Sequence, residues 1–142
     1  MTTNTGSARY EGFGKDGKGH VSTGSGALRE QPYGFATRFE GAKGTNPEEL
    51  IGAAHASCFT MALSFALARA GHADGTIETT AAITLEKQGD GFTVTRSDLV
   101  TMARVPGIAD ADFQAIAADA KTNCPISKLL NAEITLAATL TS

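Results

Sequence analysis

The chain's two thiols, Cys58 and Cys124, are the side chains best suited to nucleophilic or redox chemistry. Two cysteines are too few for a secreted disulfide scaffold, and in an intracellular chain they indicate a catalytic, redox or structural thiol. They are far apart in the sequence and form no C-x-x-C pair. Cys124 directly precedes Pro125 at a predicted helix start, where free backbone N–H groups and the helix dipole would stabilise a thiolate. On local grounds Cys124 is the thiol whose ionised form is better stabilised.

Cys58 lies within an alanine-rich helical segment, where a lone cysteine is more often a small buried side chain than a nucleophile. His55 precedes it by three residues and shares its helical face, so a Cys/His nucleophile pair or two metal ligands are alternatives. His20 and His72 stand alone and supply no further ligands at a zinc spacing. We therefore expect His55 to be a neutral, hydrogen-bonded core residue and expect no metal site and no cofactor.

Four charged residues are candidates for assisting a thiol. Arg38 and Glu40 fall on the same face of a predicted strand and would ordinarily be solvated surface charges. Glu48 and Glu49 would ordinarily be first-turn acids that complement the dipole of the helix they begin. Residue type and position alone do not indicate a chemical role for any of these charged side chains.

The composition indicates one domain. The chain has 142 residues, is 42% apolar and 19% charged, and carries a net charge of -3. That length is enough for one core and too short for two ordinary domains, so we expect residues 1–142 to form a single domain. The acidic balance offers no basic surface for nucleic acid or an anionic membrane. The N-terminal residues lack a basic start followed by an apolar stretch, so we expect no secretory signal and a cytoplasmic protein.

Turn residues and hydrophobic periodicity predict an α+β chain. The long helix begins with Asn46 as N-cap, Pro47 at the first helical position and Glu49 three residues after the cap, and Gly71 ends it. A Gly-Asp-Gly turn predicts a hairpin between the next two strands. The predicted strands are 8–13, 20–23, 33–40, 77–87, 92–104 and 132–140, and the predicted helices are 46–70, 110–121 and 124–130.

The predicted central helix carries no formal charge from Leu50 to Ala68 if His55 is neutral. Its polar side chains and the lack of an aromatic belt argue against a membrane span, so we interpret it as a helix buried on nearly every side. At about 37 Å, it is as long as a globule of this size is wide. A second chain would cover the helix surface that one chain cannot bury, and we predict an obligate homodimer with this helix at its centre.

Three segments together resemble the OsmC/Ohr family, the osmotically inducible and organic hydroperoxide resistance proteins. They are the run Gln31–Gly41 (QPYGFATRFEG), the run Gly44–Phe59 (GTNPEELIGAAHASCF) and the later Cys124-Pro125. The chain looks closest to the OsmC branch, and the similarity covers essentially its whole length.

The resemblance implies a fold and a function. The implied fold is an intertwined α+β homodimer, with antiparallel sheets wrapped around two long central helices and both active sites at the interface. The implied activity is a thiol-dependent peroxidase that prefers organic hydroperoxides to hydrogen peroxide and serves defence against oxidative and osmotic stress. By the family pattern, Cys58 is oxidised to a sulfenic acid and Cys124 resolves it as a disulfide. Arg38 faces the reactive sulfur, and Glu48 is its carboxylate partner.

The family also implies a reductant. Members of the Ohr branch are recycled by lipoylated proteins, so a dithiol reductant is the expected partner besides the hydroperoxide. The spacing adds an inference, because Glu48 and Cys58 are about 15 Å apart along an unbroken helix and about 80° apart around it. We therefore hypothesise that the Arg38–Glu48 pair of one subunit faces Cys58 of the other.

Two other classes of function are compatible with the residues alone. One is a protein that binds or stores a small molecule in the dimer cleft and uses its cysteines structurally. The other is a stress-associated interaction protein. Oxidation of the thiols by a hydroperoxide separates the enzyme from both.

Overall fold

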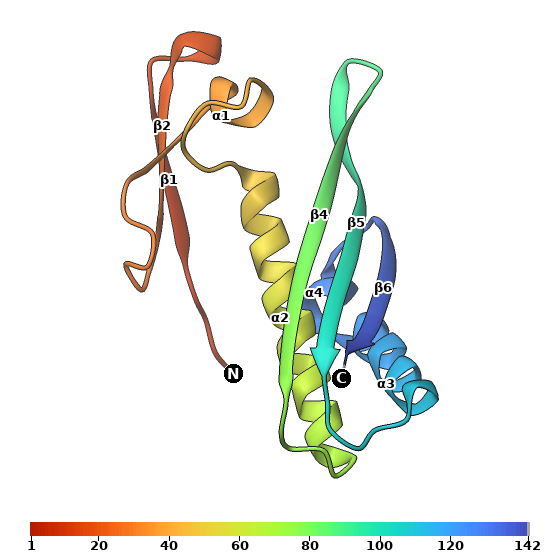
Figure 1. The fold of residues 1–142 in the computed structure, drawn as a ribbon. Coiled ribbons are helices and arrows are strands. Elements are labelled where there is room, and N and C mark those ends of the chain that lie inside the picture. The colour runs from red at the N-terminus through yellow and green to blue at the C-terminus, as the bar shows by residue number, and fades with distance from the viewer. Residues whose placement is uncertain (142) are drawn as a thin grey trace. The chain divides into compact units, whose positions relative to one another are not determined.

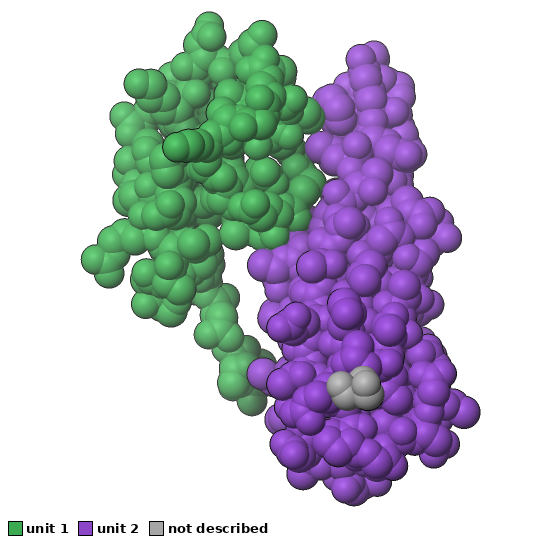
Figure 2. Space-filling model, in the orientation of Figure 1, with its two compact units in different colours: residues 1–50 green, residues 51–142 purple. Residues whose placement is uncertain are grey.

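The computed structural model describes residues 1–141 and divides into two compact units. The first unit is Met1–Leu50 and the second begins at Ile51, as the two colours of Figure 2 mark. The helix α2 (Pro47–Arg69) starts in the first unit and continues through the second. The single domain expected from the sequence stays a prediction.

The first unit is a three-stranded antiparallel sheet with two short helices (Figure 1). Its sheet order is β1-β2-β3, and Gly19 of β2 lies opposite Tyr33 of β3. The rings of Tyr10 and Tyr33 meet edge to face, 6.1 Å between centroids, and both contact the position that a side chain at Gly19 would occupy. The elements are β1 (Gly6–Glu11), a 3₁₀ turn η1 (Gly14–Asp16), β2 (Lys18–Thr23), β3 (Gln31–Tyr33) and α1 (Phe35–Phe39).

The strand predicted over 33–40 is wrong: the chain leaves β3 at Tyr33 and forms α1. The Thr37 hydroxyl accepts a hydrogen bond from the Gly34 N–H at 2.8 Å and donates to the Gly34 carbonyl at 3.0 Å, which closes the first turn. Phe35 and Phe39 pack with ring centroids 5.0 Å apart. Aromatic residues at these positions fit a period of two, but they are also four apart, the spacing of neighbours on a helix.

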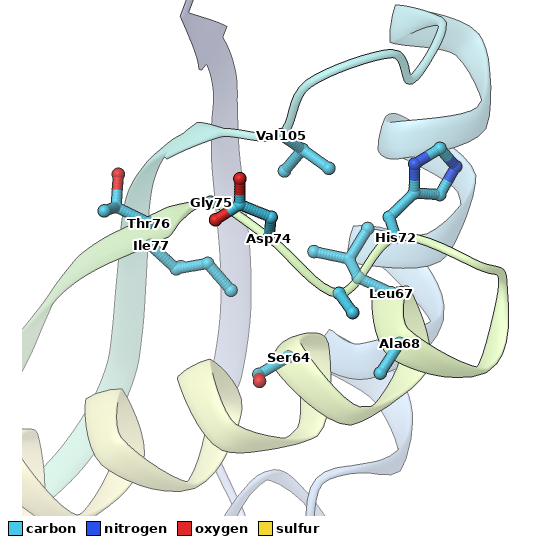
Figure 3. A pocket seen from close by; sticks show the side chains of 10 residues that line it. Ser64, Leu67, Ala68, His72, Asp74, Gly75, Thr76, Ile77 and Val105 are labelled. Atoms are coloured by element: carbon cyan, nitrogen blue, oxygen red, sulfur yellow. The ribbon is translucent and has the colours of Figure 1, made fainter.

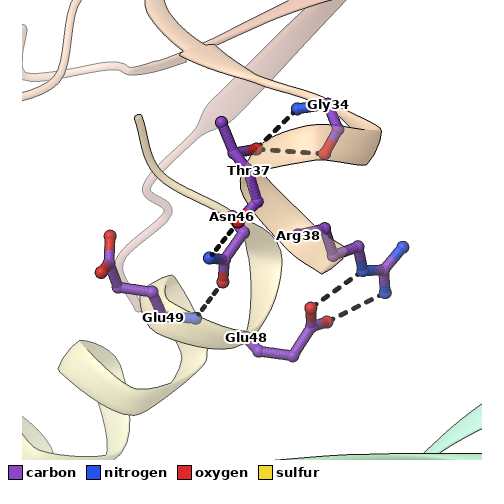
Figure 4. Close-up of polar contacts among 6 residues, drawn as sticks. All are labelled: Gly34, Thr37, Arg38, Asn46, Glu48 and Glu49. Carbon is purple, nitrogen blue, oxygen red and sulfur yellow. Dashed lines mark hydrogen bonds and ion pairs between the residues drawn. The ribbon is translucent and has the colours of Figure 1, made fainter. Parts of the chain in front are cut away.

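The start and the end of α2 confirm the predicted signals. The Asn46 side-chain oxygen accepts a hydrogen bond from the Glu49 N–H at 2.8 Å, and Pro47 is the first helical residue (Figure 4). The Glu49 carboxylate accepts from the Thr45 hydroxyl at 2.8 Å. At the other end, the N–H of His72 donates to the carbonyl of Leu67 at 2.9 Å, which satisfies a terminal carbonyl.

The second unit joins α2 to a mixed sheet of order β4-β5-β6. The predicted hairpin between β4 and β5 is confirmed. β6 runs parallel to β5, so the expectation of purely antiparallel sheets is wrong for this strand, because the connection through α3 and α4 returns the chain to the same end. Ala109 occupies the N-cap of α3. The elements are β4 (Thr76–Gln88), β5 (Gly91–Arg104), α3 (Asp110–Asn123), α4 (Pro125–Leu129) and β6 (Glu133–Thr141).

The core of the second unit lies between α2, α3 and the sheet. Phe59 and Leu63 of α2, Leu99 of β5 and Phe113 of α3 are fully or almost fully buried in one cluster. Full burial of each of these side chains contributes about 1.5–3 kcal/mol relative to exposure. One face of α2 is thereby fixed against the sheet.

The opposite face of α2 is apolar and exposed in the single chain. Met61 is 63% exposed and Phe65 is 60% exposed, and Ala53 and Ser57 lie on the same side. By length and composition alone α2 could cross a membrane, and 28% of its apolar window is buried. The expectation of a helix buried on nearly every side is therefore met on one side only, and burial by a second chain stays a prediction.

Gly44, in the turn between α1 and α2, gives a test of how tightly the first unit holds this turn. Its φ is +136°, and an added Cβ would overlap the Pro32 carbonyl oxygen and lie 2.9 Å from Thr37 Cγ2. Gly41 has a φ of +69° but open space around the Cβ position. We expect Gly44→Ala to lower the free energy of unfolding by more than about 2 kcal/mol and Gly41→Ala by about 1 kcal/mol. Urea unfolding followed by circular dichroism measures both, and equal losses would contradict the tight contact.

Candidate active site

The two thiols meet in the second unit although they are distant in the sequence. Cys58 lies in α2 and is partly buried, and Cys124 is the N-cap of α4 and is 1% exposed. The Cys124 sulfur accepts a hydrogen bond from the Ser127 N–H at 3.3 Å. Cys58 packs against the buried cluster that contains Cys124, and the Cys124 thiol and the Ile126 N–H are close enough to shift its pKa. The first turn of α4 therefore holds both sulfurs.

The surroundings of Cys58 in the chain disfavour its thiolate. Burial raises the pKa of Cys58, the Cys124 thiol raises it further, and the Ile126 N–H lowers it. Among the described residues of the second unit, no guanidinium is a group that shifts this pKa. A reactive thiolate at Cys58 needs a cation in addition to the backbone donor.

Arg38 and Glu48 form a two-pronged ion pair in the first unit (Figure 4). Arg38 Nε donates to Glu48 Oε1 at 2.8 Å, and Nη2 donates to Oε2 at 2.9 Å. The hydrogen bond to Glu48 raises the pKa of Arg38, so the guanidinium is always charged. Arg38 comes from the last turn of α1, not from the strand that the sequence predicted, and Glu48 comes from the first turn of α2.

Arg38 borders an aromatic cavity of about 420 Å³ in the first unit. That volume is in the range of small-molecule sites. The Arg38 guanidinium also stacks over Phe39, 5.6 Å from the ring centroid. The cavity can accept an apolar group beside a fixed positive charge. Its side chains are Tyr10, Lys15, Tyr33, Phe35, Arg38, Phe39 and Pro47.

The four predicted site residues thus form two pairs. Cys58 meets Cys124 in the second unit, and Arg38 meets Glu48 in the first. All four were predicted from the sequence, and the roles assigned to them stay predictions.

His55 is a buried, neutral core histidine, as predicted. It is 0% exposed, its Nδ1 lies 2.6 Å from Ser97 Oγ and its Nε2 lies 2.8 Å from Ser127 Oγ. Burial lowers the pKa of His55. Among residues 1–141 no cluster of three or more His, Cys, Asp or Glu side chains has the arrangement of a metal site.

Sequence reasoning missed both serine partners of His55. Ser97 gives no local signal, because it belongs to a strand that only the tertiary fold brings against α2. Ser127 has a weak signal, since it follows the predicted N-cap Cys124 by three residues, where a backbone N–H normally bonds to the capping side chain.

The second unit contains a small cavity near the end of α2 (Figure 3). Its volume of about 130 Å³ is below the usual range for ligand pockets. None of the four predicted site residues lines it. Among its lining side chains are Ser64, Leu67, His72, Asp74, Ile77 and Val105.

Comparison with known proteins gives a consistent result. The sequence model described as OsmC-like protein matches residues 40–139. The chain is 56% identical over 131 residues to the protein named Peroxiredoxin OsmC from Escherichia coli (strain K12), covering 92% of each chain. The same identity and coverage hold for Peroxiredoxin OsmC from Shigella flexneri.

Solved structures share the fold. The organic hydroperoxide resistance protein OhrB of Bacillus subtilis matches with a TM-score of 0.70 at 23% identity, covering 99% of this chain and 98% of the other. An organic hydroperoxide resistance protein from Elizabethkingia anophelis matches with a TM-score of 0.73 at 24% identity, covering 100% and 97%. These likenesses confirm the α+β fold class.

The buried His55 makes stability depend on pH. Because its pKa is lowered in the folded chain, the unfolded chain binds its proton first as the pH falls below the ordinary value of 6.5. The free energy of unfolding therefore falls as the pH falls from 7 to 5, because the unfolded chain takes up a proton that the buried His55 resists. Urea unfolding at fixed protein concentration should show a steeper loss for the wild type than for His55→Gln.

The matched control is His72→Gln, which changes a histidine outside this network. It should keep the wild-type dependence on pH. The buried, neutral state of His55 would be refuted by parallel pH profiles for the wild type and His55→Gln.

Proposed function

The chain belongs to the OsmC-like protein family, and we propose that it is a cysteine-based peroxidase that reduces organic hydroperoxides to alcohols. The observation that carries the proposal is that Cys58 and Cys124 lie together in the second unit, since a neighbouring thiol can resolve the oxidised form of the other. The name of the relatives that are 56% identical, peroxiredoxin OsmC, supports the same activity. We propose that it acts in the cytoplasm in defence against oxidative and osmotic stress.

The first step is attack of the Cys58 thiolate on one oxygen of the hydroperoxide. A sulfur–oxygen bond forms, the O–O bond breaks, and the other oxygen leaves as an alkoxide that takes a proton and becomes the alcohol. Cys58 is left as a sulfenic acid. Negative charge moves from sulfur to the departing oxygen, so a guanidinium beside both stabilises the thiolate and the developing alkoxide.

The second step closes a disulfide. The Cys124 sulfur attacks the Cys58 sulfenic sulfur, the S–O bond breaks, and the leaving hydroxide combines with a proton to give water. A dithiol reductant then returns two electrons and is itself oxidised to a disulfide. A lipoyl group on a partner protein has the required pair of thiols.

The aromatic cavity beside Arg38 supports an organic substrate. Its tyrosine and phenylalanine rings would bury the alkyl or aryl group of a hydroperoxide, and hydrogen peroxide has no such group. Arg38 borders this cavity, so the bound peroxide group would lie close to the guanidinium.

We infer that the complete site forms in a homodimer, where the Arg38–Glu48 pair of one subunit faces Cys58 of the other. Two features support this. Burial raises the pKa of Cys58, so its thiolate requires a cation. The exposed apolar face of α2 around Met61 and Phe65 is a surface that a second copy of the helix would cover.

Thiol counting tests the peroxidase. After one equivalent of cumene hydroperoxide per chain, the wild type should lose both thiols and gain a disulfide between residues 58 and 124. Cys58→Ser should keep its remaining thiol, because Cys124 is buried and does not attack first. Cys124→Ser should lose one thiol and form a sulfenic acid that dimedone traps.

An unchanged thiol count in the wild type would refute the peroxidase and favour a binding or structural role. Peptide mapping by mass spectrometry identifies the disulfide and the dimedone adduct.

Mixed dimers test the shared site. A dimer of one Cys58→Ser chain and one Arg38→Ala chain contains one site with both Cys58 and Arg38, provided that these come from different subunits. It should recover about half of the wild-type turnover per dimer, while each parent dimer stays near background.

The control is the dimer that combines a wild-type chain with a chain carrying both changes. It also contains two wild-type side chains, but in a shared-site dimer they belong to different sites, so turnover should stay near background. Equal activity of the two kinds of mixed dimer would rule out sharing.

A further inference from the structure

A continuous chain of buried hydrogen bonds leads from the sheet to the second thiol. Ser97 Oγ of β5 lies 2.6 Å from His55 Nδ1, and His55 Nε2 lies 2.8 Å from Ser127 Oγ. Ser127 Oγ lies 3.2 Å from Cys124 Sγ. Ser97 and His55 are 0% exposed, and Cys124 is 1% exposed. The peroxidase steps described above leave His55, Ser97 and Ser127 without a role.

The ring of His55 can act only as one donor and one acceptor. A neutral imidazole carries one N–H and one lone pair in the ring plane, and burial keeps His55 neutral by lowering its pKa. Both nitrogens bond to hydroxyls, so one serine donates to the ring and the other accepts from it. The tautomer of His55 therefore sets the direction of every hydrogen bond in the chain.

The direction decides what Cys124 receives. If Nδ1 carries the proton, the Ser127 hydroxyl donates to His55 and has no hydrogen left for the sulfur. If Nε2 carries it, Ser127 accepts from His55 and its hydroxyl hydrogen points to Cys124. The sulfur then has two donors, because the Ser127 backbone N–H already donates to it at 3.3 Å.

Two donors are what a buried nucleophilic sulfur requires. Cys124 must reach its thiolate form to attack, and at 1% exposure water cannot stabilise the charge. Hydrogen bonds to an ionised group are roughly twice as strong as those between neutral groups. The arrangement with the proton on Nε2 therefore favours attack, and the reverse arrangement opposes it.

We propose that His55 is a positioning residue for the resolving step: its Nε2–H donates to Ser127, so that the Ser127 hydroxyl and backbone N–H both donate to Cys124. This inference rests on the peroxidase function proposed above. The proton of Cys124 leaves with the hydroxide from the Cys58 sulfenic acid as water, and the sulfur–sulfur bond replaces the S–O bond. His55 stays neutral throughout and gains or loses no proton.

The consequence is protection of Cys58. A sulfenic acid that is resolved slowly remains open to a second molecule of peroxide, which oxidises it irreversibly to sulfinic acid. His55 and Ser127 thus determine the ratio of disulfide to overoxidised protein without contact with the peroxide.

Rapid mixing with cumene hydroperoxide followed by acid quench separates the two steps. In Ser127→Ala, oxidation of Cys58 should proceed at the wild-type rate, while disulfide formation should slow by about tenfold or more and sulfinic acid should accumulate. Ser127→Thr keeps the hydroxyl and should restore disulfide formation. Thr122→Ala is the matched control, because the Thr122 hydroxyl donates within its own helix to the Ala118 carbonyl, and it should behave as wild type.

The histidine is tested by side-chain type. Gln at position 55 can donate to Ser127 and accept from Ser97, so His55→Gln should retain most of the resolving rate, whereas His55→Leu should lose it. Nitrogen-15 spectra of the reduced wild type provide a readout without any variant. They should show His55 protonated on Nε2, with the signal assigned by its absence from His55→Gln.

The outcomes separate this inference from the function on which it rests. A wild type that loses no thiols refutes the peroxidase, and the positioning role falls with it. A wild type that forms the disulfide, together with Ser127→Ala resolving at the wild-type rate, overturns the inference alone. A His55 protonated on Nδ1 also overturns it.

Discussion

The proposed peroxidase depends on resolving one electrostatic conflict: a thiol would have to ionise where burial opposes its charge. Burial raises the pKa of Cys58, and the neighbouring Cys124 raises it again. Cys124 is more deeply buried still. The fold offsets this with donors aimed at the sulfurs, not with solvent. The Ile126 N–H lowers the pKa of Cys58, and the Ser127 N–H donates to the Cys124 sulfur. Both N–H groups belong to the first turn of α4.

This arrangement explains why so short a helix as α4 lies beside α2. Its five residues contribute little stability as a helix. Cys124 as N-cap turns the sulfur toward the free N–H groups of that turn, and the same turn presents Ser127 to His55. His55 in turn bonds to Ser97 of β5, so the helix that carries Cys58 and the turn that carries Cys124 are fixed to one strand. The distance between the two sulfurs is thereby held by side chains from three elements.

The sequence predicted those parts whose cause is local. Asn46, Pro47 and Glu49 determine the start of α2 through contacts within one turn, and Cys124-Pro125 determines the start of α4 in the same way. The strand predicted over 33–40 was wrong because the spacing of Phe35 and Phe39 fits both a strand and a helix. The sequence could not predict the parallel pairing of β6 with β5 or the hydrogen bond between His55 and Ser97, because both depend on how distant segments meet. The two cysteines are candidates by residue type alone, whereas the order in which they react and the choice of Arg38 and Glu48 came from family resemblance, since the two charged residues have no local signal of chemistry.

The geometry of the Arg38–Glu48 pair is better explained by orientation than by stability. Arg38 is 36% exposed, and ion pairs that reach solvent contribute only about 0–1 kcal/mol to folding. Glu48 occupies Nε and Nη2 of the guanidinium, so the plane of the group is fixed by two bonds.

A guanidinium has five N–H donors in a rigid fork, and this contact uses one from each of two nitrogens. The Nη1 side is not part of the contact with Glu48 and can donate to another group. A single hydrogen bond would let the guanidinium rotate, and its charge would not be held at one position. Two bonds fix the direction of the remaining donors, which is the condition for stabilising charge that moves from a sulfur to a departing oxygen.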